Sequence, residues 1–161
     1  MRQTKIQNFT GNIRSIVDAA FRQLTELGSL TIIFALLIFT YFHDSALAII
    51  LFIGIMTVTL ISLLIKIFFH IPRPNNQKYR NFIERVDASS FPSAHSARVS
   101  IMAFWLVIYS NVLLLKIFII VTAILVAYSR IYLKKHYFID VLGGLALGII
   151  VNLATYYIIF A

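Results

Sequence analysis

The stretch SALAIILFIGIMTVTLISLLI, residues 45–65, decides the class of fold. It contains no charged residue over 21 positions, and about 20 apolar residues in a helix cross the hydrocarbon core of a bilayer. The rest of the chain has the same character, because 60% of its 161 residues are hydrophobic and only 12% are charged. A soluble domain carries about 25% charged residues. The sequence therefore predicts an integral membrane protein.

The other apolar runs predict an all-α, polytopic transmembrane helix bundle of about five spans. A single helix over residues 99–133 would measure about 52 Å, too long for one crossing, so we place a turn at Ser110 and Asn111. Another polar turn, His43-Asp44, separates the first two runs. The predicted spans are residues 30–42, 45–69, 99–110, 111–133 and 137–161.

Residues 1–27 are more polar and predict an amphipathic helix. Their apolar side chains recur at spacings of three and four: Ile6, Phe9, Ile13, Ile16, Val17, Ala20, Phe21 and Leu24. Such a helix either lies in the membrane interface or docks on the bundle. We assign 1–27 as an amphipathic interfacial helix and 28–161 as the transmembrane core.

The charge balance points to an anionic partner at the membrane. The chain has 14 Lys and Arg against 6 Asp and Glu, a net charge of +8, and no cysteine. Basic residues that flank apolar spans favour an anionic headgroup or a phosphate, so we expect no nucleic-acid partner. Thiol chemistry is excluded.

Three polar stretches flank the spans: KIFFHIPRP at 66–74, FPSAHSAR at 91–98 and SRIYLKKHYFID at 129–140. The second and fourth spans end, and the third and fifth begin, at these stretches. They are therefore predicted to meet at one membrane face, together with a polar loop at residues 72–91.

The cations in these stretches suit a multiply charged oxyanion. Lys66, Arg73 and Arg130 have no matching cluster of carboxylates, and arginine can hold phosphate oxygens bidentately. Pro92-Ser93 is typical of a helix start, whose free N–H groups would point at the anion. Arg98, in the same stretch, either contacts the residues of the site without touching the anion or has no part in the site.

The histidines supply a nucleophile and an acid. His136 and Asp140 are four residues apart, so on one helix they would share a face. A carboxylate bonded to one imidazole nitrogen leaves the other nitrogen as a nucleophile, and His95 remains to donate a proton to a leaving alkoxide. Two alternatives are a metal site, which three nearby cations would disfavour, and a structural ion network, which one aspartate cannot balance.

The spacings of these residues resemble a known family. Lys-x6-Arg-Pro at 66–74, Pro-Ser-x-His at 92–95 and Ser-Arg-x5-His-x3-Asp at 129–140 are similar to the three signature motifs of the type 2 phosphatidic acid phosphatase superfamily, also called lipid phosphate phosphatases. Ala94 departs from the pattern, because the family most often has glycine there. Many members also have six spans.

The resemblance implies a metal-independent hydrolase of a lipid phosphate monoester or diphosphate that needs no cofactor. His136 would attack phosphorus and form a phosphohistidine, Asp140 would orient it, and His95 would protonate the leaving lipid oxygen and then activate water. The phosphate-binding residues would be Lys66, Arg73, Ser93, Ala94 and Arg130.

Several alternatives stay open at this point. The substrate is either a glycerolipid phosphate, such as phosphatidate or phosphatidylglycerophosphate, or a polyprenyl diphosphate such as undecaprenyl diphosphate. The rival functions are a vanadate-haloperoxidase-like activity, known from soluble proteins, and a non-catalytic protein that binds anionic lipid or assists transport. We assign Lys134 and Lys135 to headgroup anchoring, with substrate contact as the second interpretation.

The location is predicted as the plasma membrane, multi-pass, with the face of the site open. All 14 basic residues except Lys116 lie in the N-terminal segment or on the predicted catalytic side. The positive-inside rule would make that side cytoplasmic, whereas the resemblance to bacterial relatives implies an outward face. The oligomeric state is left open.

Overall fold

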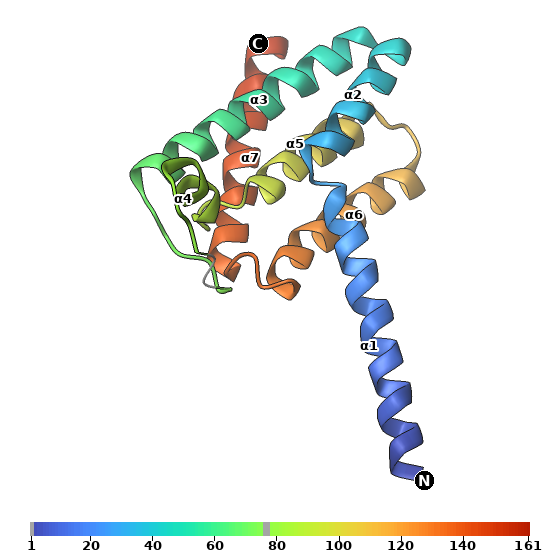
Figure 1. The fold of residues 1–161 in the computed structure, drawn as a ribbon. Helices are drawn as coiled ribbons and strands as arrows, with labels where there is room; N and C mark the ends of the chain where they lie inside the picture. Colours follow the sequence, from blue (N-terminus) through green and yellow to red (C-terminus); the bar gives the residue numbers. More distant parts are fainter. Residues whose placement is uncertain (1, 76–77) are drawn as a thin grey trace.

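The computed structural model describes residues 2–75 and 78–161. These residues form helices and no strand beyond one isolated bridge between Pro72 and Ser89, so the predicted all-α fold is confirmed. The helices, shown in Figure 1, are α1 (Arg2–Glu26), α2 (Leu30–His43), α3 (Ser45–Phe68), α4 (Phe82–Ala88), α5 (Ala94–Tyr109), α6 (Leu113–Tyr132) and α7 (Phe138–Phe160).

Three of these helices, α3, α6 and α7, are long and apolar enough to cross a membrane. Residues 11–26 of α1 and the whole of α2 pass the same test together but are bent by 52°, and α5 is a shorter apolar helix. This arrangement is roughly consistent with about five spans. Both predicted turns are confirmed: Asp44 ends α2 and caps α3 by accepting from the Leu47 N–H at 2.9 Å, and Ser110 ends α5.

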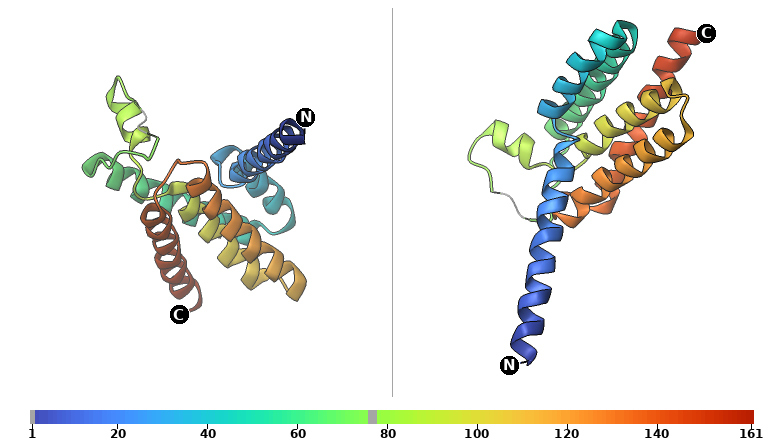
Figure 2. Two further views of the ribbon diagram at one scale, coloured as in Figure 1. Left: turned by 90° about the horizontal axis from the view of Figure 1, so that it is seen from below. Right: turned by 90° about the vertical axis from the view of Figure 1, so that its right-hand side faces the viewer.

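Helix α5 is the central element, because it packs against α3, α6 and α7 (Figure 2). Its inner face carries Ile101 and Trp105, which are fully buried against residues of α2 and α3. Glycines in α7 permit a close approach to α5: a methyl group at Gly148 would lie 2.5 Å from the Ser100 Cβ. Small residues favour such contacts in membranes, where dispersion and hydrogen bonds, rather than water exclusion, hold helices together.

Helix α1 projects beyond the bundle, on the side where α6 ends and α7 begins (Figures 1 and 2). Its second half docks on α6. The Phe21 ring stacks on Tyr132 with centroids 4.4 Å apart, and the Tyr132 hydroxyl donates to Asp18 Oδ1 at 2.6 Å. The interfacial position of residues 1–27 stays a prediction, and the side chains of Ile6 and Phe9 lie outside the described part of the chain.

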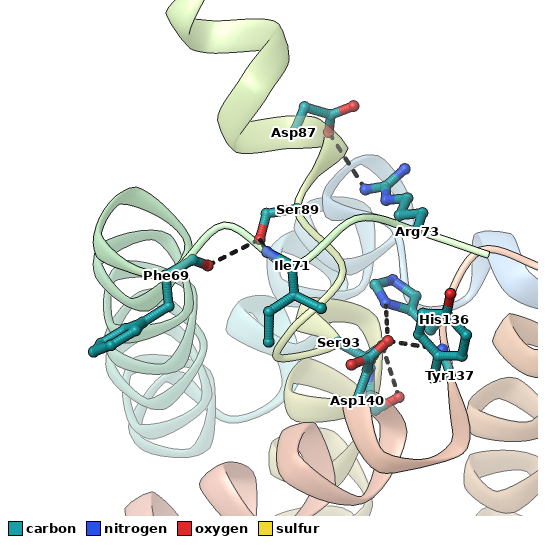
Figure 3. A network of polar contacts seen from close by, with 10 residues as sticks. Phe69, Ile71, Arg73, Asp87, Ser89, Ser93, His136, Tyr137 and Asp140 are labelled. Atoms are coloured by element: carbon teal, nitrogen blue, oxygen red, sulfur yellow. Dashed lines mark hydrogen bonds and ion pairs between the residues drawn. The ribbon is translucent and has the colours of Figure 1, made fainter. Parts of the chain in front are cut away.

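The predicted polar loop 72–91 has structure of its own, apart from residues 76 and 77, which lie outside the described residues. It contains α4, and its two ends are joined beside the end of α3. The Ser89 hydroxyl accepts from the Ile71 N–H at 3.3 Å and donates to the Phe69 carbonyl at 3.2 Å, as Figure 3 shows. The Ser90 N–H donates to the Ile71 carbonyl at 2.7 Å. The sequence interpretation missed α4, because its seven residues are too few for a clear periodicity.

Candidate active site

A polar cavity of about 250 Å³ lies where α3 and α6 end and α5 and α7 begin. The predicted meeting of the three polar stretches is therefore what the structure shows. The residues that line the cavity are Lys66, Arg73, Asp87, Ala94, His95, Arg98, Arg130, Lys135 and His136. Of the predicted site residues, only Ser93 and Asp140 do not line it; both are buried next to it.

Helix ends place the cations. Lys66 and Arg130 lie in the last turns of α3 and α6, where their charges also complement the negative ends of the helix dipoles. Arg73 follows Pro72 and forms an ion pair with Asp87, Nη2 to Oδ1, at 3.8 Å (Figure 3). Burial is the main cause that lowers the pKa of Arg73, and the Asp87 carboxylate opposes it. Asp87 is the one carboxylate among the lining residues, so the cavity is strongly positive.

His136 corrects one prediction. It does not lie on the same helix as Asp140, because α7 begins at Phe138 and His136 belongs to the preceding turn. Its Nδ1 nevertheless lies 3.7 Å from Asp140 Oδ2, as the chain turns back into the helix (Figure 3). This distance is ion-pair range and longer than a hydrogen bond.

Asp140 also holds the start of α7 in place. Its Oδ2 accepts from the Tyr137 N–H at 2.7 Å, which caps the first turn of α7, and its main-chain carbonyl accepts from the Ser93 N–H at 2.9 Å. The carboxylate is buried, and its Oδ1 has no hydrogen-bond partner among the residues that the structure describes. Asp140 thus fixes the turn that carries His136 and ties it to α5.

The electrostatics of the cavity keep His136 uncharged. Burial lowers the pKa of His136 to about 3, with further lowering by Arg130, Lys66 and Arg73. At neutral pH the imidazole is therefore neutral and has a free lone pair, which is the form that attacks an electrophile.

His95 and Arg98 form a second unit in the first turns of α5. The Arg98 Nη2 lies 3.4 Å from His95 Nδ1, and Arg98 also donates from Nε and Nη2 to the Gly28 carbonyl at 3.1 and 2.9 Å. Arg98 therefore lines the cavity, a position that the sequence alone did not decide. The spacing of three residues from His95 was the signal for it, because such residues are neighbours on a helix.

The two lysines after Tyr132 lie in different surroundings. Lys135 lines the cavity, which supports substrate contact, the second interpretation of this residue. Lys134 is exposed and has a positive φ of 53°. For Lys134, headgroup anchoring stays a prediction.

Ser93 begins α5, as predicted, and its groups are engaged locally. Its hydroxyl accepts from the Ser96 N–H at 3.4 Å and from the Ser96 hydroxyl at 2.9 Å, and its N–H donates to Asp140. The next two residues, Ala94 and His95, have first-turn N–H groups without an intrahelical acceptor. A phosphate contact of Ser93 itself stays a prediction.

An apolar groove of about 390 Å³ adjoins the polar cavity and shares Lys66, Asp87 and Ala94 with it. It runs between α3 and α4, and its other lining residues are Thr59, Ser62, Leu63, Ile67, Phe82, Ile83 and Val86. A positive cavity that continues into an apolar groove suits an amphiphile with an anionic head and a hydrocarbon tail.

The fold and this site together define a multi-pass helical membrane protein with a buried, cationic, histidine-containing pocket. The family model described as PAP2 superfamily matches residues 45–161, which is most of the chain. The chain belongs to the PAP2 superfamily, and the predicted resemblance is confirmed.

Individual relatives agree with this assignment. The chain is 36% identical over 74 residues to YbjG of Escherichia coli (strain K12), a proposed undecaprenyl-diphosphatase. This match covers 44% of the chain and 35% of YbjG, so the chain aligns with about a third of the length of this curated relative.

Two solved structures share the fold. Aquifex aeolicus LpxE has a TM-score of 0.74 and 29% identity, over 88% of this chain and 86% of LpxE. A PAP2 type phosphatidylglycerolphosphate phosphatase from Bacillus subtilis has a TM-score of 0.70 over 88% of this chain and 76% of that protein. Its 23% identity supports the likeness of fold alone.

Proposed function

We propose that this protein is a lipid phosphatase, which removes a phosphate group from a membrane lipid through a phosphohistidine. The observation that carries the proposal is a neutral imidazole, His136, placed among cations in a cavity that continues into an apolar groove. Membership of the PAP2 superfamily supports it.

The first step would form the phosphoenzyme. Since Nδ1 of His136 faces Asp140, Nε2 is the attacking atom. A bond forms between Nε2 and phosphorus, the bond from phosphorus to the leaving oxygen breaks, and the electron pair stays on that oxygen. His95 supplies the proton that the leaving oxygen takes up.

The second step would release phosphate. His95, having given up its proton, takes one from a water molecule, and the oxygen of that water attacks phosphorus. The bond between phosphorus and Nε2 then breaks, which returns the imidazole and gives inorganic phosphate. Lys66, Arg73, Arg130 and the N–H groups of Ala94 and His95 stabilise the negative charge that spreads over the phosphoryl oxygens.

We further propose that the reaction needs no metal ion or cofactor. The cations that line the cavity already supply the positive charge that a metal ion would bring to a phosphoryl group, and they would repel a second cation. The test is to measure activity in the presence of a chelator of divalent ions. We expect full activity.

Two substrate classes remain, glycerolipid phosphates and polyprenyl diphosphates. The likeness to YbjG favours a diphosphate, and the groove between α3 and α4 would accept the tail of either class. Phosphate release from phosphatidate, phosphatidylglycerophosphate and undecaprenyl diphosphate, measured side by side, separates the classes. We also propose that the protein lies in the plasma membrane.

The decisive experiment is the substitution of His136 by alanine in the full-length chain. We expect phosphate release to fall by about 1,000-fold or more, as for other catalytic nucleophiles. Acid-labile radiolabel from a lipid phosphate should be trapped on the wild type and absent from the variant. His43→Ala, an imidazole at the far end of α2, is the matched control and should retain activity. A non-catalytic lipid-binding protein would be unaffected by His136→Ala, and a haloperoxidase-like enzyme would oxidise halide when loaded with vanadate.

A further inference from the structure

The junction of α1 and α2, which precedes the residues matched by the family model, lies directly against two arginines of the cavity. Thr25 is buried in the last turn of α1, and its hydroxyl oxygen accepts from Arg130 Nη1 at 2.7 Å. Three residues later, the carbonyl of Gly28 accepts both hydrogen bonds from Arg98, at 3.1 and 2.9 Å.

Hydrogen bonds fix the conformation of this junction. The Gly28 N–H donates to the Thr25 carbonyl at 3.0 Å, and the Ser29 hydroxyl caps α2 by accepting from the Ile32 N–H. The contacts of Phe21 and Asp18 with Tyr132 fix the helix that leads into the turn. The turn also abuts His95, because a methyl group at Gly28 would lie 3.0 Å from His95 Cδ2.

The chemistry of the two acceptors has a consequence for the charge of the site. A buried guanidinium needs acceptors for its N–H groups, and a carboxylate would satisfy them while cancelling the positive charge. A hydroxyl and a main-chain carbonyl satisfy them without cancelling it. Arg98 and Arg130 therefore donate these hydrogen bonds to uncharged acceptors, whereas Arg73 faces the carboxylate of Asp87.

We propose that Thr25 and Gly28 are positioning residues of the phosphate site. They orient Arg130 and Arg98 through uncharged acceptors and so complete, from the N-terminal segment, a pocket whose other members all come from the family-matching region. This inference rests on the proposed function for its substrate, but its test requires only inorganic phosphate.

The test compares Thr25→Val, which keeps the shape and removes the hydroxyl, with Thr25→Ser, which keeps the hydroxyl. Thr40→Val is the matched control, because the Thr40 hydroxyl donates to the Leu36 carbonyl of its own helix, away from the cavity. For each full-length variant in detergent, we would measure KM and kcat with a short-chain phosphatidate and the inhibition constant of inorganic phosphate. A phosphate-dependent rise in melting temperature gives a readout without turnover.

For Thr25→Val we expect the inhibition constant of phosphate and KM to rise about tenfold, as for loss of a hydrogen bond to a charged group. Thr25→Ser should restore both, and Thr40→Val should match the wild type. If Thr25→Val binds phosphate as the wild type does, with or without a lower melting temperature, the inference is wrong.

A second pair of variants covers the case in which Thr25→Val does not fold. Thr25→Asn and Thr25→Asp are alike in shape and both present an oxygen to Arg130, but only the aspartate cancels its charge. We expect Thr25→Asn to retain phosphate binding and Thr25→Asp to lose it about tenfold. Equal binding by the two would overturn the inference. If the wild type hydrolyses no lipid phosphate, the proposed function fails, while the melting-temperature shift with phosphate still decides the role of Thr25.

Discussion

The imidazole of His136 combines two properties that nucleophilic catalysis needs. It is buried beside Asp140, whose carboxylate fixes the preceding turn by capping α7, and cations line the same cavity. Each neighbouring cation disfavours the protonated imidazole, so the same charges that would bind phosphate also keep the nucleophile ready to react.

This coupling predicts a change in the pH profile when a cation is removed. Arg73 lowers the pKa of His136, so Arg73→Gln should raise that pKa towards its ordinary value. As the pH is lowered, His136 then becomes protonated at a higher pH than in the wild type. The acid limb of the kcat/KM profile therefore moves to higher pH. At neutral pH we expect kcat/KM to fall by about 10- to 100-fold through the lost phosphate contact. The measurement is the pH dependence of kcat/KM.

The control for Arg73→Gln is Arg85→Gln, which removes the same charge from an exposed position on α4 that does not line the cavity. It should leave the acid limb in place. An acid limb of Arg73→Gln that is unmoved, or moved to lower pH, would contradict the coupling.

At the scale of elements, the contact between α5 and α7 sets the geometry of the site. Gly144 and Gly148 of α7 lie against the backbone of α5, and a methyl group at Gly144 would overlap the Ser93 carbonyl oxygen. The hydrogen bond from the Ser93 N–H to Asp140 lies one turn away. The start of α5, with His95, and the turn that carries His136 are therefore placed by one tight helix contact.

Gly144→Ala should consequently both destabilise the fold and impair the site. Overpacking of this kind costs about 1–3 kcal/mol, since the neighbour is backbone and cannot rotate away. Thermal unfolding in detergent and kcat measure the two effects. The matched control is Gly11→Ala, where a methyl group meets nothing within 4 Å and a helical position gains propensity. A melting temperature of Gly144→Ala equal to that of the control would show that α7 can move away from α5.

At the scale of the whole molecule, the cavity lies where α3 and α6 end and α5 and α7 begin. The turn between α5 and α6 lies at the other end of these helices (Figure 1). Helix α1 projects on the side of the cavity. Lys78 and Arg80 are exposed residues of the loop that joins the end of α3 to the start of α5, so they lie at the end of the bundle that carries the cavity. Asn111, between α5 and α6, lies at the opposite end.

This arrangement predicts opposite labelling of two single-cysteine variants. The chain has no cysteine of its own, so Arg80→Cys and Asn111→Cys each provide a single thiol at an exposed position. An impermeant thiol reagent applied to intact cells should label one of them and leave the other unlabelled until the cells are opened. Labelling of Arg80→Cys in intact cells would place the active site on the outer face of the membrane. Labelling of Asn111→Cys instead would place it on the cytoplasmic face. Labelling of both in intact cells would contradict the predicted topology.

The sequence by itself determined the membrane class, the turns at Asp44 and Ser110, and the residues that meet at one face. These features depend on local properties: the length of a charge-free run such as 45–65, or a cap such as Asp44 beside the first turn of α3. The order of the spans then requires alternate ends to meet, which is why Lys66, His95, Arg130 and His136 were predicted together.

Only the tertiary structure decided the partners of the buried polar groups. It placed His136 before α7 instead of on it, engaged the Ser93 N–H with Asp140, and built α4 into the loop. It also gave Arg98 and Arg130 their acceptors at Gly28 and Thr25, 70 and 105 residues away. The physical reason is that a buried guanidinium takes whichever acceptor the packed helices bring near it, and no local pattern in the sequence encodes that packing.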